Sequence, residues 1–269
     1  MPEPDPFHLD RARLRASFER ASVGYEAAAS LQARIAAELL QRLELFGFAP
    51  GVVLDLAPGM LREARRHQWP WRRFERVCGD ALRLPLQAGT VDLIFSNLML
   101  QWCEPLPAAL AEVRRVLKAD GFFAFSTFGP DTLHELRSAW AQADGYNHVN
   151  RFSDMHEVGD ALLRTGLTEP VLDVDRFEVD YPDVLTLMRD LKAIGARNVT
   201  AGRSRTLAGR SRLARVQDAY EGFRREARLP ATYEVIYGAS WGAAGRAAAA
   251  SREGIVYVAP GSIRRARRP

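Results

Sequence analysis

A strand, a tight turn and a helix follow one another between residues 52 and 66, and this unit constrains the fold more than any other part of the sequence. Residues 52–54 form a short apolar, β-branched run that ends in Asp55, Pro58-Gly59 marks a turn, and residues 60–66 have the composition of a helix. Nucleotide-type ligands bind outside the carboxyl end of such a strand, beside the N-terminus of the helix. Asp55 is therefore placed either to accept hydrogen bonds from a ribose diol or to cap the helix.

Strands and helices continue to alternate after this unit. Strands are predicted over residues 74–78, 90–97 and 122–127, and the apolar spacing of residues 107–117 predicts a helix. This order indicates an α/β fold with a doubly wound, mostly parallel sheet. The remaining predicted elements are an edge or antiparallel strand over 171–179, a last strand over 231–239, and helices over 131–143, 154–165, 183–195 and 209–226.

The chain is predicted to form one domain over residues 11–241. Residues 11–46 form a helical lid that breaks at residues 22–25, and residues 183–228 form a helical insertion. Tyr25 lies at the break, where it either covers a pocket or packs as a structural residue. We expect residues 1–10 to be a flexible leader and residues 242–269 a low-complexity basic tail.

Composition excludes several classes of function. No run of about 18 apolar residues is present, which argues against a membrane span, and the N-terminus lacks the cationic and apolar segments of a secretion signal. The cysteines, Cys78 and Cys103, indicate a reducing cytoplasm without a disulfide framework, and no Cys/His cluster has metal-site spacing. The net charge is +4, but the arginines are not interleaved with aromatic residues as on a nucleic-acid-binding surface.

Polar side chains stand at the ends of three predicted strands. Because the carboxyl ends of parallel strands meet at one edge of a sheet, Asp55, Asp80 and Asn97 are expected to share one crevice. Asp55 can hold a ribose, Asp80 can accept a hydrogen bond from the amine of adenine, and Asn97 can hold the charged or amide end of the ligand. This is the layout of a class I S-adenosylmethionine-dependent methyltransferase.

Several stretches resemble the malonyl-acyl-carrier-protein O-methyltransferase family of biotin synthesis, and together they span about residues 13–241. They are residues 22–32 (SVGYEAAASLQ), 54–65 (LDLAPGMLREAR), 79–86 (GDALRLPL), 92–103 (DLIFSNLMLQWC), 150–152 (NRF), 187–196 (LMRDLKAIGA) and 229–237 (LPATYEVIY). The resemblance implies transfer of a methyl group from S-adenosyl-L-methionine to the free carboxylate of a malonyl thioester on acyl carrier protein. It also implies that the cofactor contacts Asp55, Asp80, Asn97, Tyr25, Leu56, Met60, Ala81 and Leu82.

The substrate residues follow from the chemistry that this resemblance implies. A malonyl carboxylate is already ionised at neutral pH, so no catalytic base is required and positioning carries the reaction. Arg151 is the first candidate to select the carboxylate and Arg137 the second, although either can instead pair with a surface acid. Trp102 either walls the substrate channel or packs. An acidic carrier protein could dock on the arginines at 197, 203, 205, 210, 212 and 215.

The chain departs from the family in one respect. The family has a glycine-rich loop of the form DxGxGxG after its first strand, about 20 residues before the acid that holds ribose, and this sequence has none. Asp55 then serves as the acid of either the first or the second strand, and we favour the second. Alternatively, residues 57–59 are a shortened loop. We expect a missing strand-helix unit and weak or absent cofactor binding.

Two other functions remain open. Residues 131–137 and 179–182 also resemble a mitochondrial methyltransferase-like family that acts on an arginine of a respiratory-complex subunit, and a small-molecule acceptor is a further alternative. The missing glycine loop instead favours a non-catalytic binding or assembly protein.

Overall fold

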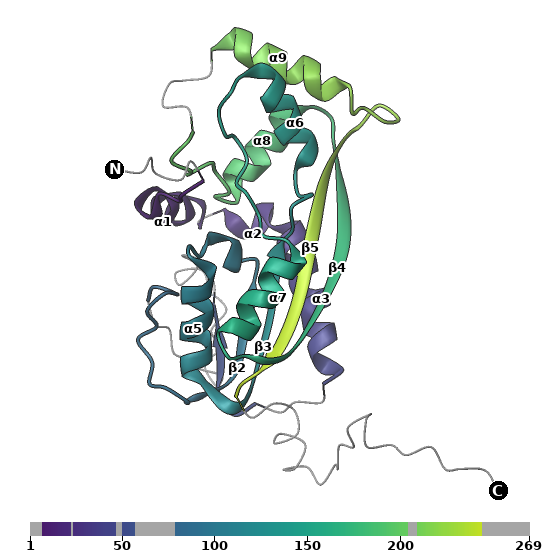
Figure 1. The fold of residues 1–269 in the computed structure, drawn as a ribbon. Coiled ribbons are helices and arrows are strands. Elements are labelled where there is room, and N and C mark those ends of the chain that lie inside the picture. The colour runs from purple at the N-terminus through teal and green to yellow at the C-terminus, as the bar shows by residue number, and fades with distance from the viewer. Residues whose placement is uncertain (1–6, 23, 47–49, 57–78, 204–208, 244–269) are drawn as a thin grey trace, which may run out of the picture.

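The computed structural model describes residues 7–22, 24–46, 50–56, 79–203 and 209–243, and this part of the chain forms a five-stranded sheet (Figure 1). Neighbouring strands β1, β2 and β3 are parallel, whereas β5 runs antiparallel to β3 and β4 runs antiparallel to β5. The prediction of an antiparallel edge strand over residues 171–179 is confirmed. In spatial order the strands are β1 (Val53–Asp55), β2 (Val91–Asn97), β3 (Leu117–Phe128), β5 (Leu229–Trp241) and β4 (Thr168–Tyr181).

Helices connect the strands close to the places that the sequence predicts. Before the sheet come α1 (Arg11–Ala21), α2 (Tyr25–Ala28) and α3 (Ser30–Glu44), which confirms the break near residue 24. After β2 the chain forms a 3-10 turn, η1 (Leu100–Trp102), and α5 (Leu106–Val116). The later helices are α6 (His134–Ala143), α7 (Met155–Arg164), α8 (Val184–Ala193) and α9 (Arg210–Glu221).

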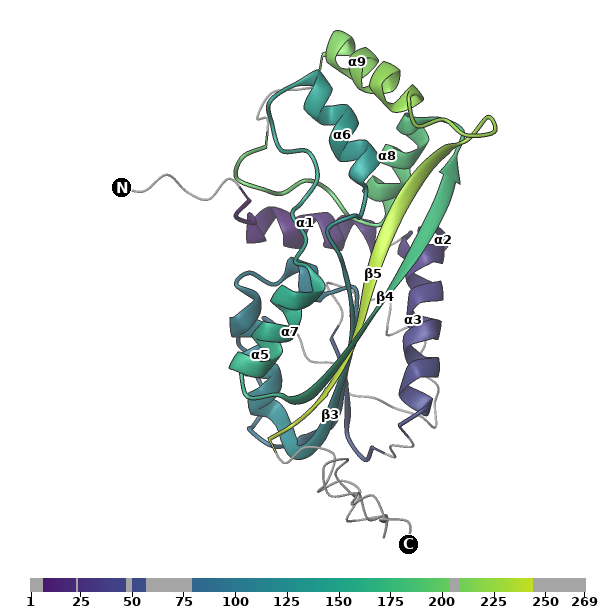
Figure 2. The same cartoon turned by 45° about the vertical axis from the view of Figure 1, so that its right-hand side comes forward.

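Helices cover both faces of the sheet, with α3 on one face and α5 and α7 on the other (Figure 2). Neighbouring residues of β2 therefore enter different cores: Leu93 joins Ile35 of α3, and Ile94 joins Leu110 of α5. All four are at least 96% buried, since none exposes more than 4% of its surface. This two-sided burial explains why the sequence of β2 is almost continuously apolar.

The long strands β4 and β5 extend beyond the rest of the sheet, and α6, α8 and α9 gather around their far end (Figure 1). Tyr220 of α9 is fully buried there, and its hydroxyl donates to the Pro230 carbonyl at 2.9 Å. Most of the predicted helical insertion lies in this region. Within the described residues, no helix is both long and apolar enough to cross a membrane.

Strand β1 pairs directly with β2, and the register sets Asp55 opposite Phe95. The described sheet is therefore continuous from β1 to β4, and a missing unit leaves no gap between these strands. Two sets of predictions lie outside the described residues. They are those for residues 57–78, which include the strand over 74–78, and those for the tail 244–269.

Candidate active site

Asn97 ends β2 as predicted, but its amide bonds to the protein itself. Its Nδ2 donates to the Gln32 carbonyl of α3 at 3.0 Å, and its Oδ1 accepts from the Ser126 hydroxyl of β3 at 2.7 Å. Ser126 Oγ also accepts from the backbone N–H of Leu98 at 3.0 Å, in a turn where Leu98 has a φ of +50°. Asn97 thus ties two strands to α3, and a ligand would have to compete with these bonds.

Asp55 lies at the end of β1. The next residue, Leu56, is buried, and its N–H donates to the Phe95 carbonyl at 2.8 Å, which extends the parallel pairing by one residue. Asp55 is an exposed residue, and partial desolvation by the nearby protein raises the pKa of its carboxyl. Met60, expected beside Asp55, lies outside the described residues.

Asp80 lies in an exposed turn, where it faces the N-terminal helix. Its Oδ2 is 3.3 Å from Nη1 of Arg11, and its Oδ1 accepts from the N–H of Leu82 at 3.0 Å. Ala81 is half-buried against the apolar core on the α5 side. Tyr25 begins α2, and burial raises the pKa of its hydroxyl.

These residues as described do not fit S-adenosylmethionine. The amide of Asn97 is engaged on both sides, and the sequence after Asp55 holds a single glycine before residue 79. Two neighbouring cavities are present in the structure, and Asp55, Asp80 and Asn97 line neither of them. We therefore derive no step that involves the cofactor.

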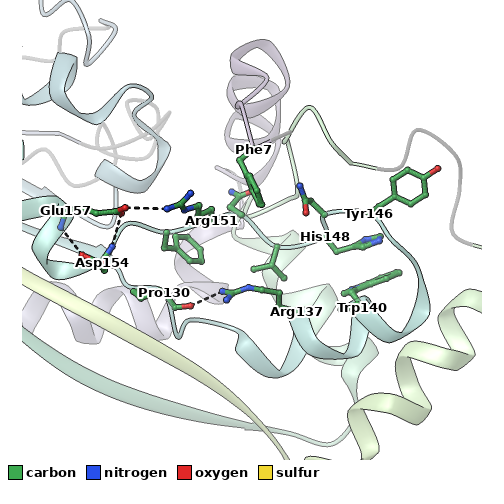
Figure 3. Close-up of a pocket in the computed structure, with 14 residues that line it drawn as sticks. Phe7, Pro130, Arg137, Trp140, Tyr146, His148, Arg151, Asp154 and Glu157 are labelled. Atoms are coloured by element: carbon green, nitrogen blue, oxygen red, sulfur yellow. Dashed lines mark hydrogen bonds and ion pairs between the residues drawn. The ribbon is translucent and has the colours of Figure 1, made fainter. Parts of the chain in front are cut away.

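The first cavity, of about 420 Å³, lies between α6, the following loop and the start of α7 (Figure 3). Arg151 and Glu157 stand at one end, Trp140 and His148 at the other, and Arg137 between them. Its lining residues are Phe7, Pro130, Arg137, Trp140, Ala141, Tyr146, Asn147, His148, Val149, Asn150, Arg151, Phe152, Asp154 and Glu157.

The second cavity, of about 490 Å³, lies next to the first, on the side of the carboxyl end of β3. Thr127 of β3, Gln101 of η1 and Cys103 contribute to its walls. Burial raises the pKa of the Cys103 thiol to about 12, so this group is a neutral part of the wall. The two cavities share Phe7, Arg151, Phe152 and Glu157, so that Arg151 lies where they meet.

Arg151 is exposed and is paired with Glu157, at 3.3 Å between Nη2 and Oε1. Both side chains are largely in solvent, with 66% and 47% exposed, and such a pair contributes at most about 1 kcal/mol. Glu157 has a second role, since its other oxygen accepts from the N–H of Asp154 in the capping box of α7. Arg151 can therefore exchange Glu157 for a ligand carboxylate while Glu157 keeps its place in the helix cap.

Arg137 is more firmly held. Its Nη2 donates to the carbonyls of Pro130 and Thr132, each at 2.9 Å. Desolvation lowers the pKa of its guanidinium, and the charge of Asp131 opposes this. Backbone carbonyls thus take part of the donor capacity of Arg137, which makes Arg151 the better candidate for a carboxylate ligand.

An aromatic wall closes the far end of the first cavity. The ring of His148 stacks on Trp140 at 3.6 Å and an interplanar angle of 9°, and its Nε2 lies 2.8 Å from Oδ1 of Asp144. Burial alone would raise the pKa of Asp144, but the Tyr146 N–H, His148 and the charge of Arg212 lower it. The wall is therefore held in place from behind by an anionic carboxylate.

The sequence prediction included Arg151 and Arg137 but missed most of this cavity. No sequence motif marks Phe7, Trp140 or His148, and the folded chain brings these residues together from separate segments. Asn150 and Phe152 belong to the resembling stretch 150–152, which was the available signal. Trp102 packs edge-to-face on Phe18 at 5.3 Å and lines neither cavity, as the packing alternative predicts.

Comparisons with known proteins agree with this fold. Residues 32–125 match a family described as a methyltransferase domain. The malonyl-[acyl-carrier protein] O-methyltransferase of Laribacter hongkongensis is 45% identical, over 90% of this chain and 93% of that protein. The protein of the same name from Halorhodospira halophila is 42% identical, over 98% of this chain and 99% of its own length. A solved SAM-dependent methyltransferase from Thermotoga maritima, 13% identical over 85% of this chain and 99% of that one, has a similar fold with a TM-score of 0.50.

The alignment with the Halorhodospira protein also reveals a shortfall inside this chain. The alignment has 292 positions, whereas this chain has only 269 residues. At least 23 positions of the alignment therefore have no residue of this chain opposite them. Because nearly the whole of both chains is aligned, these positions are internal. The expected loss of a glycine loop and the helix after it, about 20 residues, would account for most of these positions, and we refer to that expected deletion as the missing segment.

Proposed function

Because this chain belongs to the malonyl-[acyl-carrier protein] O-methyltransferase family, we propose that it methylates the free carboxylate of a malonyl thioester carried by acyl carrier protein. The chain is a methyltransferase, and its methyl donor is S-adenosyl-L-methionine, which supplies an electrophilic methyl group on a sulfonium. We place the reaction in the cytoplasm, early in biotin synthesis. The observation that carries the choice of acceptor is Arg151, a weakly paired guanidinium at the junction of two cavities.

Methyl transfer to this acceptor requires no catalytic base from the protein. A malonyl carboxylate is ionised at neutral pH and is itself the nucleophile, so the chain needs to hold it and exclude other acceptors rather than remove a proton. A guanidinium binds two carboxylate oxygens with defined geometry. Arg151 would therefore select a malonyl over an acetyl thioester, because an acetyl group offers no carboxylate.

The cavities also suit the rest of such a substrate. Phe7 and Phe152 give apolar surface beside Arg151, and the Trp140–His148 wall extends it. A thioester and its carbon chain can lie along this surface while the carboxylate stays at Arg151. The two adjoining cavities, between α6 and the end of β3, are thus suited to an elongated substrate.

The test is to identify the methylated product. The purified chain is incubated with millimolar S-adenosylmethionine and malonyl-loaded carrier protein, and acetyl-loaded carrier is the matched control. Mass spectrometry should show one added methyl ester on the malonyl carrier and no change on the acetyl carrier. Methylation of a protein arginine or another small molecule, with the malonyl carrier untouched at high cofactor, would favour an alternative acceptor.

A carrier protein has fewer free arginines to dock on than the sequence suggests. Arg203 lies 3.9 Å from Asp10 and donates to the Thr200 carbonyl, and Arg212 lies 3.3 Å from Asp144. These contacts hold two of the six predicted docking residues against the protein, and Arg205 lies outside the described residues. Arg210 is exposed on α9, as is Arg215, whose Nη2 donates to the Ala143 carbonyl.

We propose that α9 forms part of the carrier docking surface and predict the effect of Arg210→Glu. Reversing one exposed charge at the rim of an interface should raise KM for the malonyl carrier about fivefold, which corresponds to roughly 1 kcal/mol. The KM for malonyl-CoA, which lacks the carrier protein, should not change. Arg15→Glu on α1 makes the same charge change as a control. Equal KM values for the carrier with both variants would remove α9 from the docking surface.

A further inference from the structure

Asn150 is a buried residue with an unused acceptor. Only 7% of its surface is exposed, and its Oδ1 has no hydrogen-bond partner among the described residues. It lines the first cavity and directly precedes Arg151. Buried polar atoms are paired in the great majority of cases, because desolvation without a partner costs free energy. Oδ1 itself has almost no exposed surface, so a ligand in the cavity can supply the missing donor once the Asn150 side chain turns toward it.

The other unpaired buried atoms of the described residues do not have this setting. The hydroxyls of Ser96 and Ser240 lie on β2 and β5 and line neither cavity. Oδ2 of Asp144 lies 3.3 Å from the guanidinium of Arg212, which compensates its charge. Asn150 alone among these residues combines an unpaired acceptor with a cavity wall.

We propose that Asn150 Oδ1 accepts a hydrogen bond from an amide N–H in the arm that carries the malonyl group, while Arg151 binds the carboxylate. The inference rests on the proposed function, because the arm of acyl carriers and of coenzyme A is a pantetheine chain with two amides. Arg151 and Asn150 are consecutive, so the chain presents a cation and a neutral acceptor side by side. A malonyl group joined to an amide-bearing thiol offers the matching anion and donor.

The amide contact makes Asn150 a specificity-determining residue for the thiol part of the substrate. Arg151 alone would accept any small malonyl thioester, whereas Asn150 adds a preference for thiols that carry an amide. A preference of this kind arises because a substrate without the amide leaves the buried acceptor unpaired.

The experiment measures binding and needs no methyl transfer. Malonyl-pantetheine, which has the amides, and S-ethyl malonyl thioester, which has none, are titrated into the purified full chain by calorimetry. We expect the native chain to bind malonyl-pantetheine at least about tenfold more tightly, as one well-placed buried hydrogen bond allows. Asn150→Ala should remove most of this preference and leave the affinity for the S-ethyl thioester within about twofold.

A second variant separates the lost acceptor from a damaged fold. Asn150→Asp keeps an acceptor at this position, so the ratio of the two affinities should stay close to the native one even if both decrease. Thermal unfolding confirms that each variant is folded. A native chain without preference, or a full preference in Asn150→Ala, would overturn the inference and leave the proposed function intact. A native chain that binds neither thioester would overturn the proposed function, and the inference with it.

Discussion

Replacing Arg151 by methionine should weaken the binding of a malonyl thioester about 100-fold or more. The substitution keeps the length of the side chain but removes a charged, bidentate donor, and two hydrogen bonds to a carboxylate contribute roughly 3 kcal/mol. Acetyl thioesters should bind the variant and the native chain alike, because they have no carboxylate. Calorimetric titration of malonyl-CoA and acetyl-CoA gives both affinities.

Two further substitutions sharpen this prediction. Arg151→Lys should recover only part of the loss, because an ammonium group cannot match both carboxylate oxygens. Glu157→Gln should strengthen malonyl binding about threefold, since it removes the competing carboxylate at 3.3 Å, while glutamine can still serve the capping box of α7. Arg20→Met on the exposed face of α1 is the matched control. A native malonyl affinity in Arg151→Met would transfer the selecting role to Arg137 or away from the cavity.

Restoring the missing segment should increase the affinity for S-adenosylhomocysteine about 100-fold or more. The segment of the Laribacter hongkongensis relative, with its glycine-rich loop, is inserted between Gly51 and Val52, because we favour Asp55 as the acid that holds ribose and the loop precedes that acid. A glycine-rich loop lets backbone N–H groups approach the ligand closely, and several such hydrogen bonds are each worth about 1 kcal/mol or more. The native chain, which lacks this loop, should bind with a dissociation constant of about 100 μM or weaker.

The control for this insertion has the same length but a different content. A glycine-serine linker of equal length at the same position adds chain without the loop, and it should not raise the affinity. Calorimetry and the shift in melting temperature with ligand report binding independently of activity. Micromolar binding by the native chain would show that residues 57–59 serve as a sufficient loop.

The fold was largely predictable because its strands and helices are local patterns. Two-sided burial makes β2 a continuous apolar run, and alternation marks β4 as an antiparallel strand. The capping box at Asp154 and Glu157, followed by Gly166 at a φ of +82°, sets the limits of α7. The position of β5 between β3 and β4 was not predictable in this way, because it depends on pairing between segments far apart in the chain.

The site was predictable only in part, because a residue type does not specify its partner. Asn97 was expected to be free for a ligand, yet the carbonyl of Gln32 and the hydroxyl of Ser126 take both ends of its amide. Their proximity arises only when α3 packs on the sheet. The wall of Trp140 and His148 depends in the same way on the loop after α6 folding back over that helix.

A crystal structure of the chain with malonyl-pantetheine bound tests the role of Arg151 most directly. We expect the carboxylate to lie in the first cavity within hydrogen-bonding distance, about 3 Å, of the Arg151 guanidinium, with Glu157 displaced from it. We also expect an amide N–H of the arm to donate to Asn150 Oδ1. A malonyl group bound outside this cavity, with the Arg151–Glu157 pair intact, would show that Arg151 does not select the carboxylate.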